Sequence, residues 1–221
     1  MNNPTLRSGL GRALMASLAI SGVLGGCVAA VGGAMVGGTM MAVDRRSAGA
    51  QVDDQTIDLR AASAISAAVV DRAHVNASSY NRVVLLTGEV PTEADRAKVE
   101  AAVAKVENVR AVVNELAVMP NSSFSQQSND TLITGKVKAA FVDAKELQVA
   151  SMKVVTERGI VYLMGRVTEA EANVAGNVAR SVSGVQKVVK VFEIITPAEL
   201  AAMPVPPSTA PAAPPASAPG K

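Results

Sequence analysis

Residues 154–168 read Val-Val-Thr-Glu-Arg-Gly-Ile-Val-Tyr-Leu-Met-Gly-Arg-Val-Thr, and this stretch decides the fold. Two runs rich in β-branched residues are joined at Arg158-Gly159, where glycine permits a tight turn. Gly165 follows the second run, and Thr168 is suited to begin a helix. The stretch therefore predicts a β-hairpin that leads directly into an α-helix.

A similar pattern occurs earlier in the chain, over residues 76–90. Gly88 matches Gly165 at a spacing of 77 residues, and Asp54 matches Asp130 at a spacing of 76 residues. One small module is therefore present twice. Because modules of this size bury little apolar surface on their own, we expect the two copies to pack together.

Both copies predict the order helix, strand, strand, helix, strand, from the spacing of their apolar residues. In the first copy we expect a helix over 55–70, strands over 75–80 and 83–87, a helix opened by Thr92, and a strand over 109–118. In the second copy we expect a helix over 131–143, strands over 152–156 and 160–164, a helix over 169–182, and a strand over 185–195. Asn108 and Gly184 follow the second helices and suit a left-handed backbone. The predicted fold class is α+β, with two tandem αββαβ modules.

The N-terminus has the features of a secretory signal. Arg7 and Arg12 precede an uncharged apolar run over residues 13–24. Gly25-Gly26 then precede Cys27, an arrangement that resembles the bacterial lipobox, whose cysteine becomes the lipidated first residue of the mature protein and carries palmitate. As an alternative, the uncharged segment 13–43 is long enough to span a bilayer, which takes roughly 20 residues. Its glycine content favours a flexible tether instead.

Composition divides the chain into six parts. We expect a lipoprotein signal peptide over 1–26, a lipidated cysteine and Gly/Ala-rich tether over 27–52, the modules over 53–120 and 128–196, a linker over 121–127, and a disordered Pro/Ala-rich tail over 197–221.

The remaining composition excludes several classes of function. Without Arg7 and Arg12 the 19 remaining basic residues balance 19 acidic residues, which argues against nucleic-acid binding. A single cysteine and a single histidine exclude a disulfide and a Cys/His metal cluster. His74 is expected in an exposed loop, and the acidic pairs Asp53-Asp54 and Glu169/Glu171 are explained by helix starts. We therefore predict no catalytic residues, no metal and no cofactor.

The paired modules resemble BON domains. The features that carry the resemblance are Gly88 and Gly165 at the strand ends, and the turns Val106-Glu-Asn-Val109 and Val182-Ser-Gly-Val185. With the lipobox cysteine, the chain is similar to the dual BON-domain outer-membrane lipoproteins of Gram-negative bacteria. The resemblance implies, for each module, a three-stranded mixed sheet with two helices on one face. It also implies a lipid anchor on the periplasmic face of the outer membrane and a role in envelope integrity, notably near division sites.

The resemblance further implies that the first helix of the second module binds anionic phospholipid of the phosphatidylglycerol or cardiolipin type. Helical spacing directs one set of apolar and basic residues outward. These are the residues expected to bind phospholipid: Leu132, Gly135, Lys136, Lys138, Ala139 and Val142. Ile133, Val137, Ala140 and Ala144 then face the sheet, with Phe141 at the edge. A member of the family has Trp where this chain has Leu132, and Trp is the better interfacial anchor.

The first module is less suited to a membrane. The positions that match Leu132, Gly135, Lys138, Ala139 and Val142 are Thr56, Leu59, Ala62, Ser63 and Ser66, with no basic residue among them. Residues 53–120 contain 7 basic and 10 acidic side chains, whereas residues 128–196 contain 9 basic and 7 acidic ones. Two alternatives stay open at this point. In one, Leu132 and Val142 pack against the first module or the linker, and Lys136 and Lys138 are an ordinary solvated face. In the other, the chain is a chaperone-like adaptor that binds envelope proteins, including outer-membrane assembly or division proteins.

Overall fold

The computed structural model describes residues 44–69 and 73–203. The expected signal peptide, Cys27, most of the expected tether and the tail beyond Met203 lie outside the described residues. The described residues lie in one compact unit, which contains both modules.

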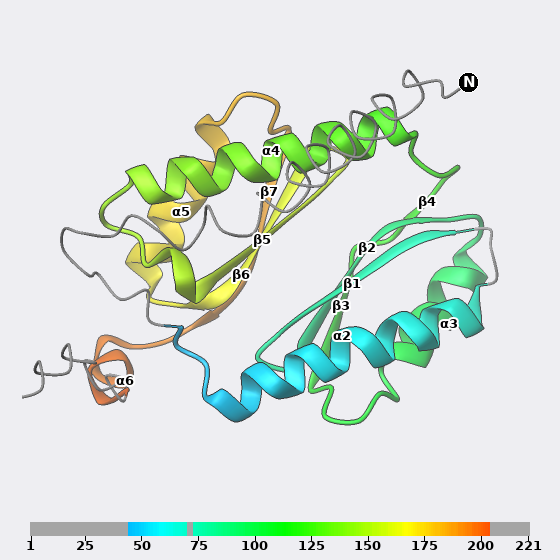
Figure 1. Ribbon diagram of the computed structural model, residues 1–221, viewed down its shortest axis with the longest axis horizontal. Helices are drawn as coiled ribbons and strands as arrows, with labels where there is room; N and C mark the ends of the chain where they lie inside the picture. The colour runs from blue at the N-terminus through cyan, green and yellow to red at the C-terminus, as the bar shows by residue number, and fades with distance from the viewer. Residues whose placement is uncertain (1–43, 70–72, 204–221) are drawn as a thin grey trace, which may run out of the picture. The chain divides into compact units, whose positions relative to one another are not determined.

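The first module has the expected order of elements (Figure 1). Its elements are α2 (Ala48–Ala68), β1 (His74–Tyr80), β2 (Val83–Val90), α3 (Glu93–Val103), β3 (Ala111–Asn114) and β4 (Ala117–Val118). β2 is central, antiparallel to β1 and parallel to β3 and β4, which follow one another along the same edge. The expected single strand over 109–118 is therefore interrupted. Asn114 Oδ1 accepts the backbone N–H of Leu116, and the Leu116 side chain turns into the core.

The second module repeats this arrangement with an uninterrupted last strand (Figure 1). Its elements are α4 (Phe124–Asp143), the short 3₁₀ turn η2 (Val149–Ser151), β5 (Met152–Glu157), β6 (Ile160–Val167), α5 (Glu169–Ser181) and β7 (Lys187–Ile194). β6 is antiparallel to β5 and parallel to β7. The expected mixed sheet with helices on one face is confirmed in both modules.

Side chains alternate between the two faces of each sheet along its central strand, and they form three hydrophobic clusters. Val84 and Leu86 of β2 face α2 and α3, and Val161 and Leu163 of β6 face α4 and α5. The residues between them point to the opposite faces of the sheets, because side chains alternate along a strand. There Tyr80, Leu85, Tyr162 and Met164 form a third cluster that draws on both modules. The two copies therefore pack together, as expected.

Both first helices begin seven residues earlier than expected. Ser47 caps α2 through a bond from the Ala50 N–H, so residues 48–52 belong to the helix rather than to the tether. Ser123 and Gln126 form a capping box for α4, so the expected linker over 121–127 is helical from Phe124 onward. Serine and glycine near these starts made helical residues look like connecting segments.

Two other expectations about local structure need correction. Gly88 and Gly165 lie inside β2 and β6 rather than at the strand ends. A Cβ at either position would collide with backbone atoms of the neighbouring segment. Glycine therefore allows the two backbones to approach each other closely. Phe141 is fully buried in the centre of the α4 core rather than at its edge. The left-handed backbones of Asn108 (φ +68°) and Gly184 (φ +99°) are confirmed.

The expected disordered tail also begins with ordered structure. Residues Pro197–Ala202 form the short helix α6, with Pro197 in the first turn and a capping box between Thr196 and Glu199. The proline content predicted a disordered tail, but proline in the first turn is compatible with a helix. Within residues 44–69 and 73–203, each helix is too short or too polar to cross a bilayer.

Candidate functional site

The outer face of α4 is exposed along the whole helix. All six residues expected to bind phospholipid are exposed, including Leu132 at 64% and Val142 at 67%. The alternative in which these side chains pack against the first module is therefore wrong. Their opposite neighbours Ile133 and Val137 are buried against the sheet, which fixes the rotation of the helix.

Phe124 extends this face at its N-terminal end. Its side chain is 84% exposed. At about 100° per residue, position 124 projects in the same direction as Val142 and close to Gly135. The expected start at residue 131 had excluded Phe124 from the helix. The capping pattern Ser123-Phe-Ser-Gln126 was the signal that would have found it. We call Phe124, Leu132, Gly135, Lys136, Lys138, Ala139 and Val142 the α4 outer face.

The basic side chains of this face are free to bind a ligand. Among the described residues, neither Lys136 nor Lys138 forms a salt bridge, and both are exposed. Lys145 follows the helix and is also exposed, next to the exposed acidic residue Asp143. The α4 outer face thus combines exposed apolar groups with unneutralised positive charge.

The equivalent face of α2 differs in charge. Arg60 occupies the position that matches Lys136, but it pairs with Glu107 of the same module. Leu59 is exposed at 75%, whereas the position that matches Val142 is Ser66, whose hydroxyl bonds to the helix backbone. The first module therefore presents two exposed apolar side chains, Val52 and Leu59, beside an arginine that is paired.

An aspartate of each first helix also accepts hydrogen bonds from the hairpin turn of its own module. Asp54 Oδ1 accepts the Arg82 N–H at 2.8 Å and Oδ2 accepts the Asn81 N–H at 2.7 Å. Asp130 does the same for Arg158 and Gly159, at 2.7 and 2.8 Å. These turns have positive φ at both central residues, as the tight hairpin turn demands, and a nearby carboxylate offsets the strain at the non-glycine positions.

The expectation that Asp54 is explained by the start of its helix is wrong. Asp54 lies in the second turn of α2 and is only 3% exposed. Burial by itself raises the pKa of Asp54, but bonds from Ser79, Arg82, Arg46 and Asn81 outweigh it and lower the pKa. The carboxylate therefore belongs to the hairpin turn rather than to the helix dipole.

Polar contacts surround the shared cluster between the modules. Tyr80 Oη donates to the Ser151 carbonyl oxygen at 2.7 Å, and burial raises the Tyr80 pKa to about 12. Glu193 of β7 accepts bonds from Asn81 and Arg110 of the first module, both at 2.8 Å. These contacts hold the modules in one arrangement.

The segment that precedes α2 joins the same network. Arg45 forms a bidentate salt bridge with Glu171 of the second module, at 2.7 and 2.8 Å. The pair with Arg45, helped by bonds from Thr168, lowers the pKa of Glu171. Arg46 binds Asp54 at 2.7 Å and lies 4.4 Å from the centre of the Tyr80 ring. Consecutive arginines thus attach the start of the described chain to both modules.

A buried acidic cluster lies at the edge of this joint. His74 is the first residue of β1 rather than part of an exposed loop, and its side chain is 25% exposed. It contacts Glu89 of the same module, which is fully buried, and faces Glu157 of the second module. Arg158 Nη1 lies 2.9 Å from Glu89 Oε1. The sequence argument missed this set because its members are far apart in the chain.

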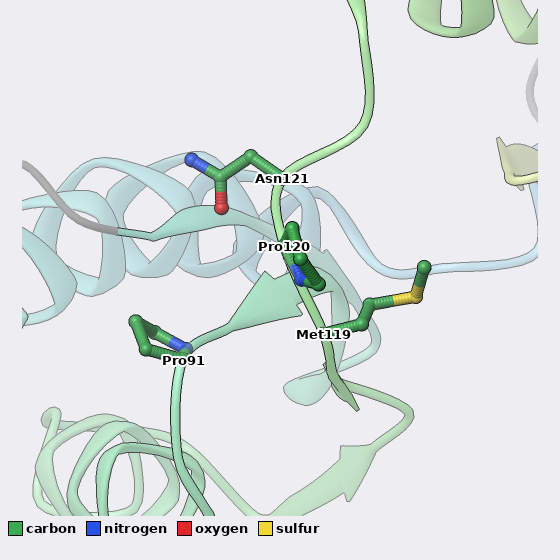
Figure 2. Close-up of a pocket in the computed structure, with 4 residues that line it drawn as sticks. All are labelled: Pro91, Met119, Pro120 and Asn121. Atoms are coloured by element: carbon green, nitrogen blue, oxygen red, sulfur yellow. The ribbon is translucent and has the colours of Figure 1, made fainter.

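One surface hollow, of about 410 Å³, lies where the first module ends (Figure 2). It is lined by Pro91, Met119, Pro120 and Asn121, none of which carries a titratable or nucleophilic side chain. This hollow therefore provides no group for acid–base or covalent chemistry.

Comparison with known proteins gives the family. The BON domain model matches residues 53–120 and 129–196. The chain is 41% identical over 175 residues to the outer membrane lipoprotein DolP of Haemophilus influenzae, covering 78% of this chain and 90% of that protein. It is 37% identical over 155 residues to a 21 kDa hemolysin of Actinobacillus pleuropneumoniae, covering 69% of this chain and 80% of that protein. It is 28% identical over 145 residues to osmotically-inducible protein Y of Escherichia coli, covering 62% and 70%. None of these relatives is named as an enzyme. With two matched domains and this identity over most of its length, the chain belongs to the BON-domain family and is a dual BON-domain relative of DolP.

Proposed function

We propose that this protein is a non-enzymatic lipoprotein of the outer membrane that binds anionic phospholipid through the α4 outer face. In this proposal Cys27 carries the lipid anchor, and the modules lie on the periplasmic side. The bound lipid is of the phosphatidylglycerol or cardiolipin type. Binding supports envelope integrity, with division sites as one place of action. Similarity to DolP supports the location, and the exposed α4 outer face supports the lipid contact.

The observation that carries the proposal is the joint exposure of apolar and basic side chains on one helix. Phe124, Leu132 and Val142 are each more than 60% exposed, and exposed apolar side chains grouped on one face are typical of an interaction surface. An interfacial helix buries such side chains at the level of the headgroups, while its lysines meet anionic phosphates. The same helix holds its module together through buried residues on its inner face, so it can bind without unfolding.

The expected interaction free energies indicate that the helix alone binds the membrane weakly. Partial burial of three apolar side chains contributes on the order of 1 kcal/mol each, and each surface lysine near anionic lipid contributes ~1 kcal/mol. A total of roughly 5 kcal/mol corresponds to an apparent association constant of a few thousand per molar. A lipid anchor would raise the effective concentration of the helix at the bilayer and so compensate for this weakness.

A vesicle co-sedimentation experiment tests the proposal. The chain that begins at Ala42, which forms one compact unit, is mixed with phosphatidylcholine vesicles with and without phosphatidylglycerol. We expect preferential binding to the anionic vesicles. Lys136→Glu combined with Val142→Glu should weaken that binding about 100-fold, since charge reversal and loss of an apolar contact together cost ~3 kcal/mol.

The repeat supplies a control of matched charge. Arg60→Glu combined with Ser66→Glu makes the same change in charge at the corresponding positions of α2, and it should leave binding within a few-fold of the parent chain. Phe124→Ala should weaken binding without altering the dependence on salt, because it removes only an apolar contact. Equal binding to neutral and anionic vesicles, or equal losses in the two charge-reversed chains, would reject the lipid proposal and favour a protein-binding adaptor.

A further inference from the structure

His74, Glu89 and Glu157 converge on one point at the joint between the modules. His74 Nδ1 lies 3.1 Å from Glu89 Oε2 and 3.9 Å from Glu157 Oε1. All three ligand atoms lie within 4.8 Å of one another. The two glutamate side chains are 0% and 5% exposed, so this is a buried set rather than a solvated acidic surface.

Among the described residues, the negative charges of this set outnumber the guanidinium that faces them. Arg158 pairs with Glu89 through Oε1, and Ser122 donates from its N–H and its hydroxyl to Oε2. Glu157 accepts a bond from the Asn76 amide on Oε2 at 3.2 Å, while its Oε1 faces the imidazole. Within the described part of the chain, two carboxylates therefore face one guanidinium, with His74 as the remaining basic group beside them.

The pKa directions agree with a shortage of positive charge. Burial raises the pKa of Glu157, and the facing His74 only partly opposes this effect. Burial acts in the same direction on Glu89, but bonds from Arg158, Ser122 and His74 outweigh it and lower the pKa of Glu89. Glu157 is thus the carboxylate that the present partners compensate least.

A polar hollow adjoins the set and provides space for a solvent ligand. It measures about 200 Å³ and is lined by His74, Asn76, Gln127, Asp130, Thr131, Thr134, Thr156 and Glu157. Water needs several polar partners to be held in such a space, and this lining provides them.

We propose that His74 Nδ1, Glu89 Oε2 and Glu157 Oε1 bind a divalent transition metal, with Zn²⁺ the best match. One imidazole nitrogen and two carboxylate oxygens are a donor set that suits zinc, with water from the hollow as the fourth ligand. Metal–ligand distances of roughly 2.0–2.2 Å require donors about 3.3 Å apart, whereas the three ligand atoms here lie within 4.8 Å of one another, so binding would draw the Glu157 side chain inward.

Neighbouring groups can orient the ligands. Arg158 stays on Glu89 Oε1, and the metal would bind Oε2 beside the two bonds that this oxygen accepts from Ser122, as outer groups commonly orient a ligand at metal sites. Binding through Nδ1 places the imidazole proton on Nε2, which lies 3.2 Å from the Asn76 amide. Rotation of that amide presents its oxygen to this proton and gives up the bond to Glu157 Oε2, whose charge the metal would then balance. Because Glu157 comes from the second module, the metal would fasten the two modules together.

Thermal unfolding of the full-length chain in detergent, stripped of metal with a chelator, tests the site. We expect ZnCl₂ at pH 7.5 to raise the Tm by about 5 °C and MgCl₂ to have little effect. Glu157→Gln and His74→Gln should each abolish the zinc-dependent rise. Thr134→Ala, which alters the hollow without removing a ligand, should retain it.

A second measurement separates ligation from indirect effects. Co²⁺ in a mixed nitrogen and oxygen site absorbs visible light, and this absorption should appear with the parent chain and disappear with His74→Gln. Zinc that leaves the parent Tm unchanged, or a rise that persists in both ligand variants, would overturn the proposal. A Tm that rises on acidification to pH 5.5 but not with zinc would also overturn it, because the set would then take up a proton instead.

Discussion

Replacing Gly88 with alanine is expected to lower the free energy of unfolding by about 3 kcal/mol or more. A Cβ at position 88 would lie 1.9 Å from the His74 carbonyl oxygen of the paired strand. Both colliding groups belong to backbones within a sheet, so neither can rotate away as a side chain would. The φ of +112° at Gly88 adds strain for any L-residue. Urea denaturation followed by circular dichroism measures the loss.

Gly135→Ala is the matched control with the opposite sign. No heavy atom lies within 4 Å of a Cβ at this exposed position inside α4. Alanine should therefore raise the free energy of unfolding by up to about 1 kcal/mol, through its higher helix propensity. If Gly88→Ala were tolerated as well as Gly135→Ala, the close approach of β1 to β2 would be contradicted.

Asp54→Ala is expected to cost about 4 kcal/mol. The carboxylate accepts the Asn81 and Arg82 N–H groups and the Ser79 hydroxyl, and the alanine variant leaves these donors without their partner in a buried site. Each bond to a charged acceptor contributes roughly 1.5–3 kcal/mol. Asp53→Ala is the control, because Asp53 pairs mainly with the half-exposed Arg82 side chain and should cost less than about 1 kcal/mol.

Acid should remove the contribution of Asp54. Its folded-state pKa is lower than its ordinary value of 3.8, so its stabilisation is fully present above that value. As the pH falls below 3.8 through the lowered folded-state pKa, this stabilisation disappears. The difference in unfolding free energy between the parent chain and Asp54→Asn should therefore shrink on acidification. A difference that stays constant from pH 7 to strongly acidic pH would show that the charge of Asp54 does not stabilise the turn.

The sequence predicted the elements whose residues repeat with a clear period. Ile57, Ala61 and Ile65 of α2 are buried as their helical spacing predicts, and so are Val99 and Val103 of α3. The capping pattern of Thr168 and Glu171 predicted the start of α5 to the residue. These signals are local, since each depends on residues within one or two turns of each other.

Other features required contacts between distant residues. The hydrogen bond that Asp130 accepts from the Arg158 N–H joins positions 28 residues apart, and His74 faces Glu157 of the other module. Nothing in the local pattern around either residue indicates such a partner. Phe124 was missed for a different reason, because the polar residues beside it resemble a linker until Ser123 is recognised as a cap.

The most direct test of the central claim asks whether the α4 outer face enters the bilayer. Val142→Cys and, at the matched position of α2, Ser66→Cys are made in the chain that begins at Ala42, which lacks Cys27, and are labelled with an environment-sensitive fluorophore. With vesicles that contain phosphatidylglycerol, the label at 142 should shift its emission to the blue and brighten, while the label at 66 should not change. An unchanged label at 142, or equal changes at both positions, would contradict the account.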